Sequence, residues 1–400
     1  MHYKFLFGFM LVLLIACQPV EGLSGDLLLW YAADDADTNV LGMMVAEYEE
    51  TESHVNIIAL PIPADELADR YTSAAAQGLG PDVVLGSAEF IHQWAKNGLI
   101  KPVDASSMNV TLPVAQLATV YQEQTYGVPL AVYPLVLYYN TDRVSEPAVD
   151  LNQWLVQARE GQRILLHNRL QALFWGVPAF NGTLMDNTGQ ITLAFEPVLN
   201  WLSWLKTAQA DGDLIISRDD ILLQDRFLSG DAAYILADSR FLMQATSMLT
   251  DTVGITTLPR GISPSGSLVE VEAFMLNKNA GPVQTEVATH LISYLTNAEQ
   301  SATWLRETGR VPANQNTRVD RRLYPFLAIV AEEAKFGLPY SADIDLTTLR
   351  QLGGILFADV LSGSDTPENA LCEFGRNLQA GYPDQFNIAE WVSTCGLEEE

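Results

Sequence analysis

Histidine, cysteine and basic residues are scarce in this chain of 400 residues. It has five His, three Cys, and 22 Lys and Arg against 49 Asp and Glu, which gives a formal net charge of −27 at pH 7. This charge argues against a nucleic-acid partner and against tight adhesion to anionic lipid headgroups. The His residues are scattered, so they support neither a metal site nor a Ser-His-Asp triad. We expect no cofactor.

Motifs of catalysis and metal binding are also missing. The sequence contains no glycine-rich phosphate loop, no Cys-x-x-Cys and no His-Glu-x-x-His pattern. Residues 35–39, DADTN, begin like a calcium-binding EF-hand loop, but Val40 and Ala46 stand where that loop requires Gly and Glu. We therefore interpret this stretch as helix capping and a solvated loop. Carboxylates are abundant enough to leave a hydrolase with a catalytic carboxylate pair open as an alternative.

The sequence has one marked apolar run, at its N-terminus, and no later stretch approaches 18 uncharged apolar residues. Phe5–Ala16 is an apolar run of 12 residues behind Lys4, too short to span a bilayer comfortably and typical of a signal peptide. It ends in Leu-Ile-Ala-Cys17, which resembles the lipobox of bacterial lipoproteins. We expect residues 1–16 to be a lipoprotein signal peptide, Cys17 to be lipidated and 17–25 to form a tether. Ordinary secretion with cleavage elsewhere is the alternative.

Two cysteines remain once Cys17 is set aside, and both lie near the C-terminus. An even pair in an oxidising compartment favours a disulfide between Cys372 and Cys395. Two buried free thiols are the alternative, because a sequence does not show whether the sulfur atoms meet.

The body of the chain alternates apolar strand patterns with amphipathic helix patterns. Residues 26–33, 54–60 and 80–86 lead into or form buried strands separated by helices, and 163–167 repeats the pattern before a long helix that ends at Gly212. Such alternation predicts mainly parallel sheets flanked by helices, with ligands beyond the C-terminal strand ends. The length, with 48% hydrophobic residues, favours two domains over one.

Aromatic residues are plentiful, with eight Trp among them. Tyr31, Tyr133, Trp175 and Phe241 sit at or beside loops rather than inside regular apolar faces. Aromatic faces bury the CH-rich surfaces of sugars and other neutral rings, which favours a ligand of that kind. For any single aromatic residue, packing in the core is the alternative.

Six stretches follow one another in a recognisable order. They are LLLWYAADDADTNVLGMMVAEYEE, GLGPDVVLGSAEFIHQWAKNGLIKPVD, YGVPLAVYPLVLYYNTDRV, DRFLSGDAAYILADSR, VEVEAFMLNKNA and TGRVPAN. In this order, behind a lipobox-like start, they resemble the extracellular solute-binding proteins of ABC importers, in the maltose-binding-like group. The resemblance covers nearly all of the mature chain.

The resemblance implies an α/β fold of two lobes, the periplasmic-binding-protein-like fold of type II. Each lobe would be a mainly parallel sheet flanked by helices, and hinge crossovers would join the lobes. In the stretch at 125–143, Pro134 restricts Tyr133 to an extended conformation, as a crossing between lobes requires. The implied parts are lobe 1 at 26–132 plus 273–311, lobe 2 at 135–268 plus 315–395, and crossovers near 131–135, 268–274 and 310–314.

The resemblance also implies that a solute binds in the cleft between the lobes. Leu173, Arg240 and Arg350 stand where maltodextrin binders place stacking aromatics, so arginines and carboxylates would equally suit hydroxyls, a uronate or a zwitterion. The ligand-binding candidates carried over by position are Asp34, Asp35, Ser87, Glu89, Tyr133, Phe174, Trp175, Asp238, Arg240, Glu270 and Arg350.

The function implied is that of a non-enzymatic solute-binding component of an ABC import system. The protein would capture a small solute, a carbohydrate in the first place, and deliver it to permease subunits. It would be a monomer held by its lipid on the extracytoplasmic face of the cell membrane. A polyamine, an amino acid or another non-sugar solute is the alternative ligand, and an extracytoplasmic carboxylate-dependent hydrolase is the alternative from another class.

Overall fold

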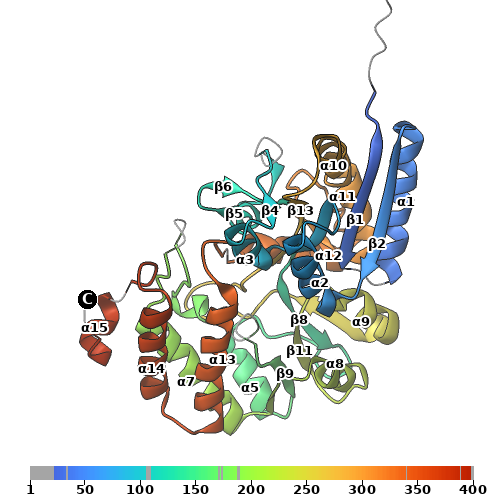
Figure 1. Cartoon of the computed structure of the whole chain (residues 1–400). Coiled ribbons are helices and arrows are strands. Elements are labelled where there is room, and N and C mark those ends of the chain that lie inside the picture. The colour runs from blue at the N-terminus through green and yellow to red at the C-terminus, as the bar shows by residue number, and fades with distance from the viewer. Residues whose placement is uncertain are drawn as a thin grey trace, which may run out of the picture.

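The computed structural model describes residues 22–32, 35–104, 110–169, 172, 174–186, 190–338, 340–387 and 389–397. They fold into two lobes, each built around its own β-sheet, and Figure 1 shows one lobe above the other. Residues 1–21, with the expected signal peptide and Cys17, lie outside the described residues. Within the described ranges, no helix combines the length and the apolar character needed to cross a membrane.

The upper lobe contains a sheet of seven strands in the order β14-β7-β13-β3-β1-β2, with β4 paired beside β13. The strands are β1 (Gly25–Ala32), β2 (Val55–Ile62), β3 (Val83–Ser87), β4 (Ile100–Lys101), β7 (Val128–Tyr133), β13 (Glu270–Asn277) and β14 (Val311–Pro312). A hairpin of β5 (Val120–Tyr121) and β6 (Gln124–Thr125) lies beside α3. The helices are α1 (Asp35–Thr51), α2 (Ala64–Ala76), η1 (Ala88–Phe90), α3 (Ile91–Lys96), α4 (Pro113–Leu117), α10 (Pro282–Leu295) and α11 (Ala298–Thr308).

The lower lobe contains a sheet of five strands in the order β10-β9-β11-β8-β12. They are β8 (Leu135–Asn140), β9 (Ile164–His167), β10 (Leu214–Ser217), β11 (Tyr234–Asp238) and β12 (Val253–Thr256). The helices of this part of the chain are α5 (Leu151–Arg159), η3 (Pro178–Phe180), α7 (Phe195–Asp211), α8 (Asp220–Leu228), α9 (Phe241–Leu249), η4 (Thr250–Thr252), α12 (Pro325–Glu333), η5 (Ala334–Phe336), α13 (Leu346–Ser362), α14 (Pro367–Gly381) and α15 (Ala389–Cys395). As predicted, α7 ends next to Gly212.

Both sheets are mixed rather than mainly parallel, which corrects one detail of the predicted fold. β1 pairs in parallel with β2 and β3, and β9 pairs in parallel with β10 and β11. β13 is antiparallel to β3 and β7, and β8 is antiparallel to β11 and β12. The reason is that β8 and β13 enter their sheets directly from the other lobe, so no crossover helix within one lobe sets their direction.

The proline-interrupted stretch at 125–143 carries the chain from the upper sheet into the lower one. β7 ends at Tyr133 and β8 begins at Leu135, with only Pro134 between them. Proline disfavours a helical conformation of the residue before it, so Pro134 helps to keep Tyr133 extended at the junction. The chain returns to the upper sheet between β12 and β13 and leaves it again after β14.

Three tryptophans build the core of the lower lobe. Trp154, Trp175 and Trp201 are fully buried, and the ring centroids of Trp175 lie 5.7 Å from Trp154 and 4.9 Å from Trp201. A Cβ atom at Gly176 would collide with the Trp201 ring, so this close approach requires glycine there.

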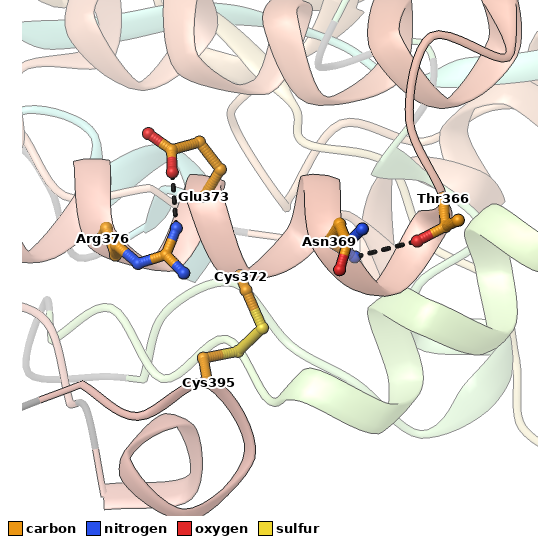
Figure 2. Close-up of a disulfide and its surroundings, with 6 residues drawn as sticks. All are labelled: Thr366, Asn369, Cys372, Glu373, Arg376 and Cys395. Carbon is orange, nitrogen blue, oxygen red and sulfur yellow. Dashed lines mark hydrogen bonds and ion pairs between the residues drawn. A yellow bond between two sulfur atoms is a disulfide. The ribbon is translucent and has the colours of Figure 1, made fainter.

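The C-terminal helices pack on the lower lobe, where Figure 1 shows α7, α13 and α14 side by side. A disulfide joins Cys372 in α14 to Cys395 at the end of α15 (Figure 2). Trp391 of α15 is fully buried, and its Nε1 donates a hydrogen bond of 2.9 Å to the carbonyl oxygen of Leu193. The last helix is therefore held by a covalent bond and by a buried ring.

Candidate functional site

A cavity of about 770 Å³ lies where the two lobes meet. Its lower wall is the carboxyl-terminal edge of β9, β10 and β11, another wall is α13, and Tyr133 and Glu270 contribute from the crossing strands. Glu89 of η1 reaches it from the upper lobe. The volume is that of a small-molecule site, and the position beyond the strand ends is where α/β sheets bind ligands.

Arg240 lies at the centre of the cavity's charged groups. Its Nη2 is 2.7 Å from Asp238 Oδ2 and 2.9 Å from Glu270 Oε2, and its Nε donates to Asp238 Oδ1 at 3.1 Å. The guanidinium carbon stands 4.6 Å from the centre of the Tyr133 ring. Two carboxylates and an aromatic face therefore fix the orientation of Arg240, while half of its side chain, 50%, stays exposed.

These groups shift each other's proton affinities. Burial raises the pKa of Glu270, and the neighbouring Asp238 and Glu89 add to this while Arg240 opposes it. Burial also pushes the pKa of Asp238 upward, but Arg240 outweighs burial and holds that pKa below its usual range. Burial disfavours the charge on Arg240, yet Asp238 and Glu270 more than compensate and raise its pKa. Arg240 thus remains a cation in the cavity.

An ion pair between Arg350 and Glu89 crosses the cavity from α13 to η1. Burial opposes the charge on Arg350, but its hydrogen bond to Glu89 and the charge of that carboxylate raise its pKa. η1 belongs to the upper lobe and α13 to the lower, so this pair joins the lobes through two residues that a solute in the cavity would meet.

A further polar group lines the cavity at the ends of β9 and β10. His167 Nε2 lies 3.1 Å from Asp220 Oδ1 and 3.0 Å from the carbonyl oxygen of Arg218. Both partners only accept hydrogen bonds, so the Nε2 atom must carry a proton. Burial, followed by the charge of Arg169, lowers the pKa of His167 and so favours the neutral ring, whereas the charge of Asp220 opposes this shift. Arg169 Nη2 donates to Asp220 Oδ2 at 2.5 Å.

A sealed cluster lies on the other side of Tyr133. The Tyr133 hydroxyl donates to Glu272 Oε2 at 2.7 Å and accepts a bond of 2.8 Å from Arg310 Nε. Arg310 also pairs with Asp37 of α1, and its guanidinium lies 5.0 Å from the Trp304 ring centre. Arg310 and Glu272 are buried, with 6% and 8% of their side chains exposed. Burial raises the pKa of Tyr133, so its hydroxyl stays protonated.

The structure brings six of the eleven sequence candidates together at the cavity. They are Glu89, Tyr133, Asp238, Arg240, Glu270 and Arg350. Ser87 does not line the cavity: its Oγ caps η1 by accepting a bond of 3.4 Å from the Glu89 backbone N–H, which orients Glu89. Asp35 begins α1, and Asp34 lies outside the described residues.

Phe174 and Trp175 are in the core rather than in the cavity, which corrects their assignment as ligand contacts. Phe174 is 2% exposed and Trp175 is 0% exposed, and neither lines the cavity. Both side chains are large and apolar, so they are more stable when buried in the core than in a cavity that is open to water. None of the eight Trp lines this cavity, so its lining gives no support to the stacking role suggested by their number.

Sequence reasoning missed the lower wall of the cavity and the sealed cluster. The rule that ligands bind beyond strand ends also holds for β9 and β10, and applied there it would have found the residues at this edge. Arg310 stands inside the TGRVPAN stretch, but its burial depends on Asp37 and Glu272, which are far away in sequence. The missed cavity residues include His167, Asn168, Arg169, Arg218, Asp220, Gln224 and Gln351.

Two lobes, three passages of chain between them and a charged cavity at their junction define a binding protein of the hinged, two-lobe class. The chain belongs to the family described as bacterial extracellular solute-binding protein, whose family model matches residues 43–320. Among the residues that the structure describes, no group of three His, Cys, Asp or Glu side chains is arranged to hold a metal ion.

Similar proteins carry sugar-binding names. The galactooligosaccharide-binding protein of Bacillus subtilis (strain 168) is 24% identical over 394 residues, covering 90% of this chain and 91% of that protein. The maltotriose-binding protein of Pyrococcus abyssi (strain GE5 / Orsay) is 28% identical over 134 residues, which cover 32% of this chain and 29% of that protein.

Solved structures share the fold. The GacH receptor of Streptomyces glaucescens superposes with a TM-score of 0.79 at 18% identity, over 90% of this chain and 99% of that one. A cyclo/maltodextrin-binding protein complexed with maltotetraose gives a TM-score of 0.78 at 19% identity, over 92% of this chain and 100% of that one. The type II two-lobe fold is therefore confirmed.

Proposed function

We propose that this protein captures a small carbohydrate outside the cytoplasm and delivers it to the permease subunits of an ABC importer. The observation that carries the proposal is the cavity at the lobe junction, lined by Glu89 from one lobe, Arg350 from the other and Tyr133 between them. Closely spaced donors and acceptors of this kind match the hydroxyl groups of a sugar. The galactooligosaccharide-binding relative, similar over 90% of this chain, supports a saccharide.

The proposed mechanism is a population shift. A solute that contacts both lobes gains its full binding free energy only when the lobes are closed around it, so it favours the closed arrangement. The lobes are taken as 26–132 plus 273–311 and 135–268 plus 315–395, with hinges near 131–135, 268–274 and 310–314. The closed form would then dock on the permease with surfaces of both lobes.

We further propose that the protein is a lipid-anchored monomer without enzymatic activity. The lipobox-like Leu-Ile-Ala-Cys17 sequence supports an anchor on the extracytoplasmic face of the membrane. The cavity carboxylates at positions 89, 220, 238 and 270 all form ion pairs, which fits a binding site better than a pair of carboxylates free for acid-base chemistry.

A thermal-shift screen followed by calorimetry tests the function. The purified protein would be heated with neutral and acidic saccharides, amino acids and polyamines, and we expect a saccharide to raise the unfolding temperature as its concentration exceeds its Kd. Mass spectrometry of the recovered saccharide should show it unchanged. Small-angle scattering should show a more compact protein when that saccharide is bound.

Three outcomes would overturn the proposal. One is stabilisation by an amino acid or a polyamine in place of any saccharide, and another is hydrolysis of the saccharide. The third is a panel in which nothing stabilises the protein. Arg321→Gln serves as a control for charge removal, because Arg321 is exposed and does not line the cavity.

A further inference from the structure

The charges that line the cavity do not follow the composition of the chain. The whole chain has 22 Lys and Arg against 49 Asp and Glu, yet the cavity has four arginines, Arg169, Arg218, Arg240 and Arg350, against four carboxylates. Cationic side chains are therefore concentrated at this site. Arginine, rather than lysine, supplies all of them, and its planar fork matches a carboxylate.

The ion pairs within the cavity decide which sign of charge is left over. Each of the carboxylates already has a cationic partner: Glu89 pairs with Arg350, Asp238 and Glu270 pair with Arg240, and Asp220 pairs with Arg169. Arg218 has no ion-pair partner among the residues that the structure describes, and its side chain is exposed. Arg240 carries one charge against two carboxylates, so the four arginines and four carboxylates balance overall, and Arg218 is the cation left without a carboxylate. An anionic group of a solute would pair with Arg218 without breaking an ion pair of the cavity.

Arg218 and Arg169 belong to one group at the ends of β9 and β10. Asp220 holds Arg169 at 2.5 Å and His167 at 3.1 Å, and His167 in turn lies 3.0 Å from the Arg218 backbone carbonyl. Arg169 has five N–H donors, and its one bond to Asp220 leaves others for a ligand. This group thus offers two guanidinium groups at one edge of the cavity.

No aromatic face in the cavity is available for a neutral sugar ring. Tyr133 and Phe241 are the only Tyr, Phe or Trp among the described residues that line it. The Arg240 guanidinium lies over the Tyr133 ring at 4.6 Å, and Phe241 is 4% exposed with edge contacts to Tyr138 and Phe227. Stacking, the main apolar contribution to binding of a neutral sugar, is absent at this site.

The net charge of the chain does not prevent an anion from binding here. Charges farther away than about 8 Å are largely screened at physiological ionic strength, so the remote carboxylates of the chain act weakly on the cavity. Local guanidinium groups act at hydrogen-bond distance and outweigh that screened field.

We propose that the solute is an acidic saccharide, a sugar that carries a carboxylate, and that Arg218 and Arg169 bind this carboxylate while the Arg240 and Arg350 ion pairs bind its hydroxyl groups. This inference rests on the proposed saccharide-capture function and names its substrate class. The carboxylate supplies the missing partner of Arg218, and the paired carboxylates accept hydrogen bonds from the sugar hydroxyls.

Calorimetry with matched sugar pairs tests the proposal. The probes are the disaccharides of galacturonate and galactose, and those of glucuronate and glucose. Within each pair the two members differ by a carboxylate in place of the hydroxymethyl group on each of the two rings. We expect the acidic member of at least one pair to bind about tenfold or more tightly than its neutral partner, the effect of one charge-assisted contact. Added salt should weaken the acidic member and leave the neutral one nearly unchanged.

Two variants locate the effect. Arg218→Gln should weaken binding of the acidic disaccharide by about tenfold and leave the neutral one unchanged, because only the carboxylate contact is lost. Arg321→Gln removes the same charge from an exposed position outside the cavity and should change neither affinity. The unfolding temperature of both variants without ligand shows that they are folded.

The outcomes separate this inference from the function on which it rests. If neutral members bind as tightly as acidic ones in both pairs, or if Arg218→Gln weakens both members equally, the acidic-saccharide proposal is overturned while saccharide capture stands. If no saccharide of either kind binds, both proposals are overturned.

Discussion

Two arginines on opposite sides of Tyr133 have the same kinds of partner and different surroundings. Arg310 contacts the hydroxyl and pairs with Glu272 and Asp37, while Arg240 lies over the ring and pairs with Asp238 and Glu270. The Arg310 side chain is 6% exposed and that of Arg240 is 50% exposed.

This difference in exposure distinguishes an ion-pair cluster that stabilises the fold from one that is available to bind a solute. A buried ion pair that loses one partner leaves an uncompensated charge without water, which costs about 3–5 kcal/mol, whereas an exposed pair is worth about 1 kcal/mol or less. We infer that the Arg310 cluster stabilises the junction of the lobes. The Arg240 cluster leaves its charges available to a solute. The four variants below test this contrast in order of their expected effect on stability.

The largest effect is expected from Arg310→Met. It removes the cation from two buried carboxylates, and we expect a loss of about 3–5 kcal/mol in the free energy of unfolding. Urea unfolding followed by circular dichroism measures the change. Arg321→Met, at an exposed position, is the matched control and should change stability by about 0.5 kcal/mol or less. A loss below about 1 kcal/mol for Arg310→Met would show that the cluster is not structural.

Glu333 at the end of α12 shows what a buried carboxylate does without an arginine. It is 4% exposed, and no described cation pairs with it. Burial raises its pKa from 4.5 to about 7, with a hydrogen bond from the Leu258 backbone opposing and Glu332 adding to the shift. The folded state therefore binds the proton more tightly than the unfolded state does.

The sign of the pH effect follows from this. The stability contributed by the neutral carboxyl is fully present below about pH 4.5 and is lost as the pH rises towards about 7, above which the loss is complete. We expect Glu333→Gln to remove this loss and to gain about 3 kcal/mol over the wild type at about pH 8. Unfolding of both proteins across this pH range measures it. A constant difference at every pH would contradict the assignment.

Tyr133→Phe should have a smaller effect, because it removes only the hydroxyl between the two clusters. Glu272 loses a donor and Arg310 loses an acceptor, and we expect a loss of about 1–2 kcal/mol in the free energy of unfolding. The ring remains under Arg240, so the affinity for a saccharide should change by less than about threefold. A large loss of affinity with unchanged stability would place the hydroxyl in the binding site instead.

The sequence could predict what depends on local pattern and order. Alternating strand and helix patterns indicated the α/β class, and Pro134 indicated an extended Tyr133, while the two lobes and the crossing between them came from the resemblance to a known family. Charged candidates such as Arg240 and Glu270 follow or begin strands, so their position at a strand end could be predicted. The cavity residues at 167–169 and 218–220 obey the same rule and were within reach of it.

What could not be predicted depends on burial set by distant contacts. Trp175 beside a loop looks exposed in the sequence, yet Trp154 and Trp201 from two different helices enclose it. In the same way, Arg310 and Arg240 look alike in the sequence, and only the folded chain shows that one is sealed and the other open. The antiparallel entry of β8 and β13 likewise depends on passages between lobes rather than on local periodicity.

The smallest effect on stability, and the sharpest test of the contrast, is expected from Arg240→Met. Because Arg240 is half exposed, we expect a loss of about 1 kcal/mol or less in the free energy of unfolding. Affinity for the saccharide should fall about tenfold or more, since the donors that Asp238 and Glu270 orient are gone. Arg240→Lys keeps the charge but lacks the planar fork, so its affinity should fall between those of the wild type and Arg240→Met. If Arg240→Met instead unfolds the protein as readily as Arg310→Met does, the two clusters are both structural and exposure does not separate them.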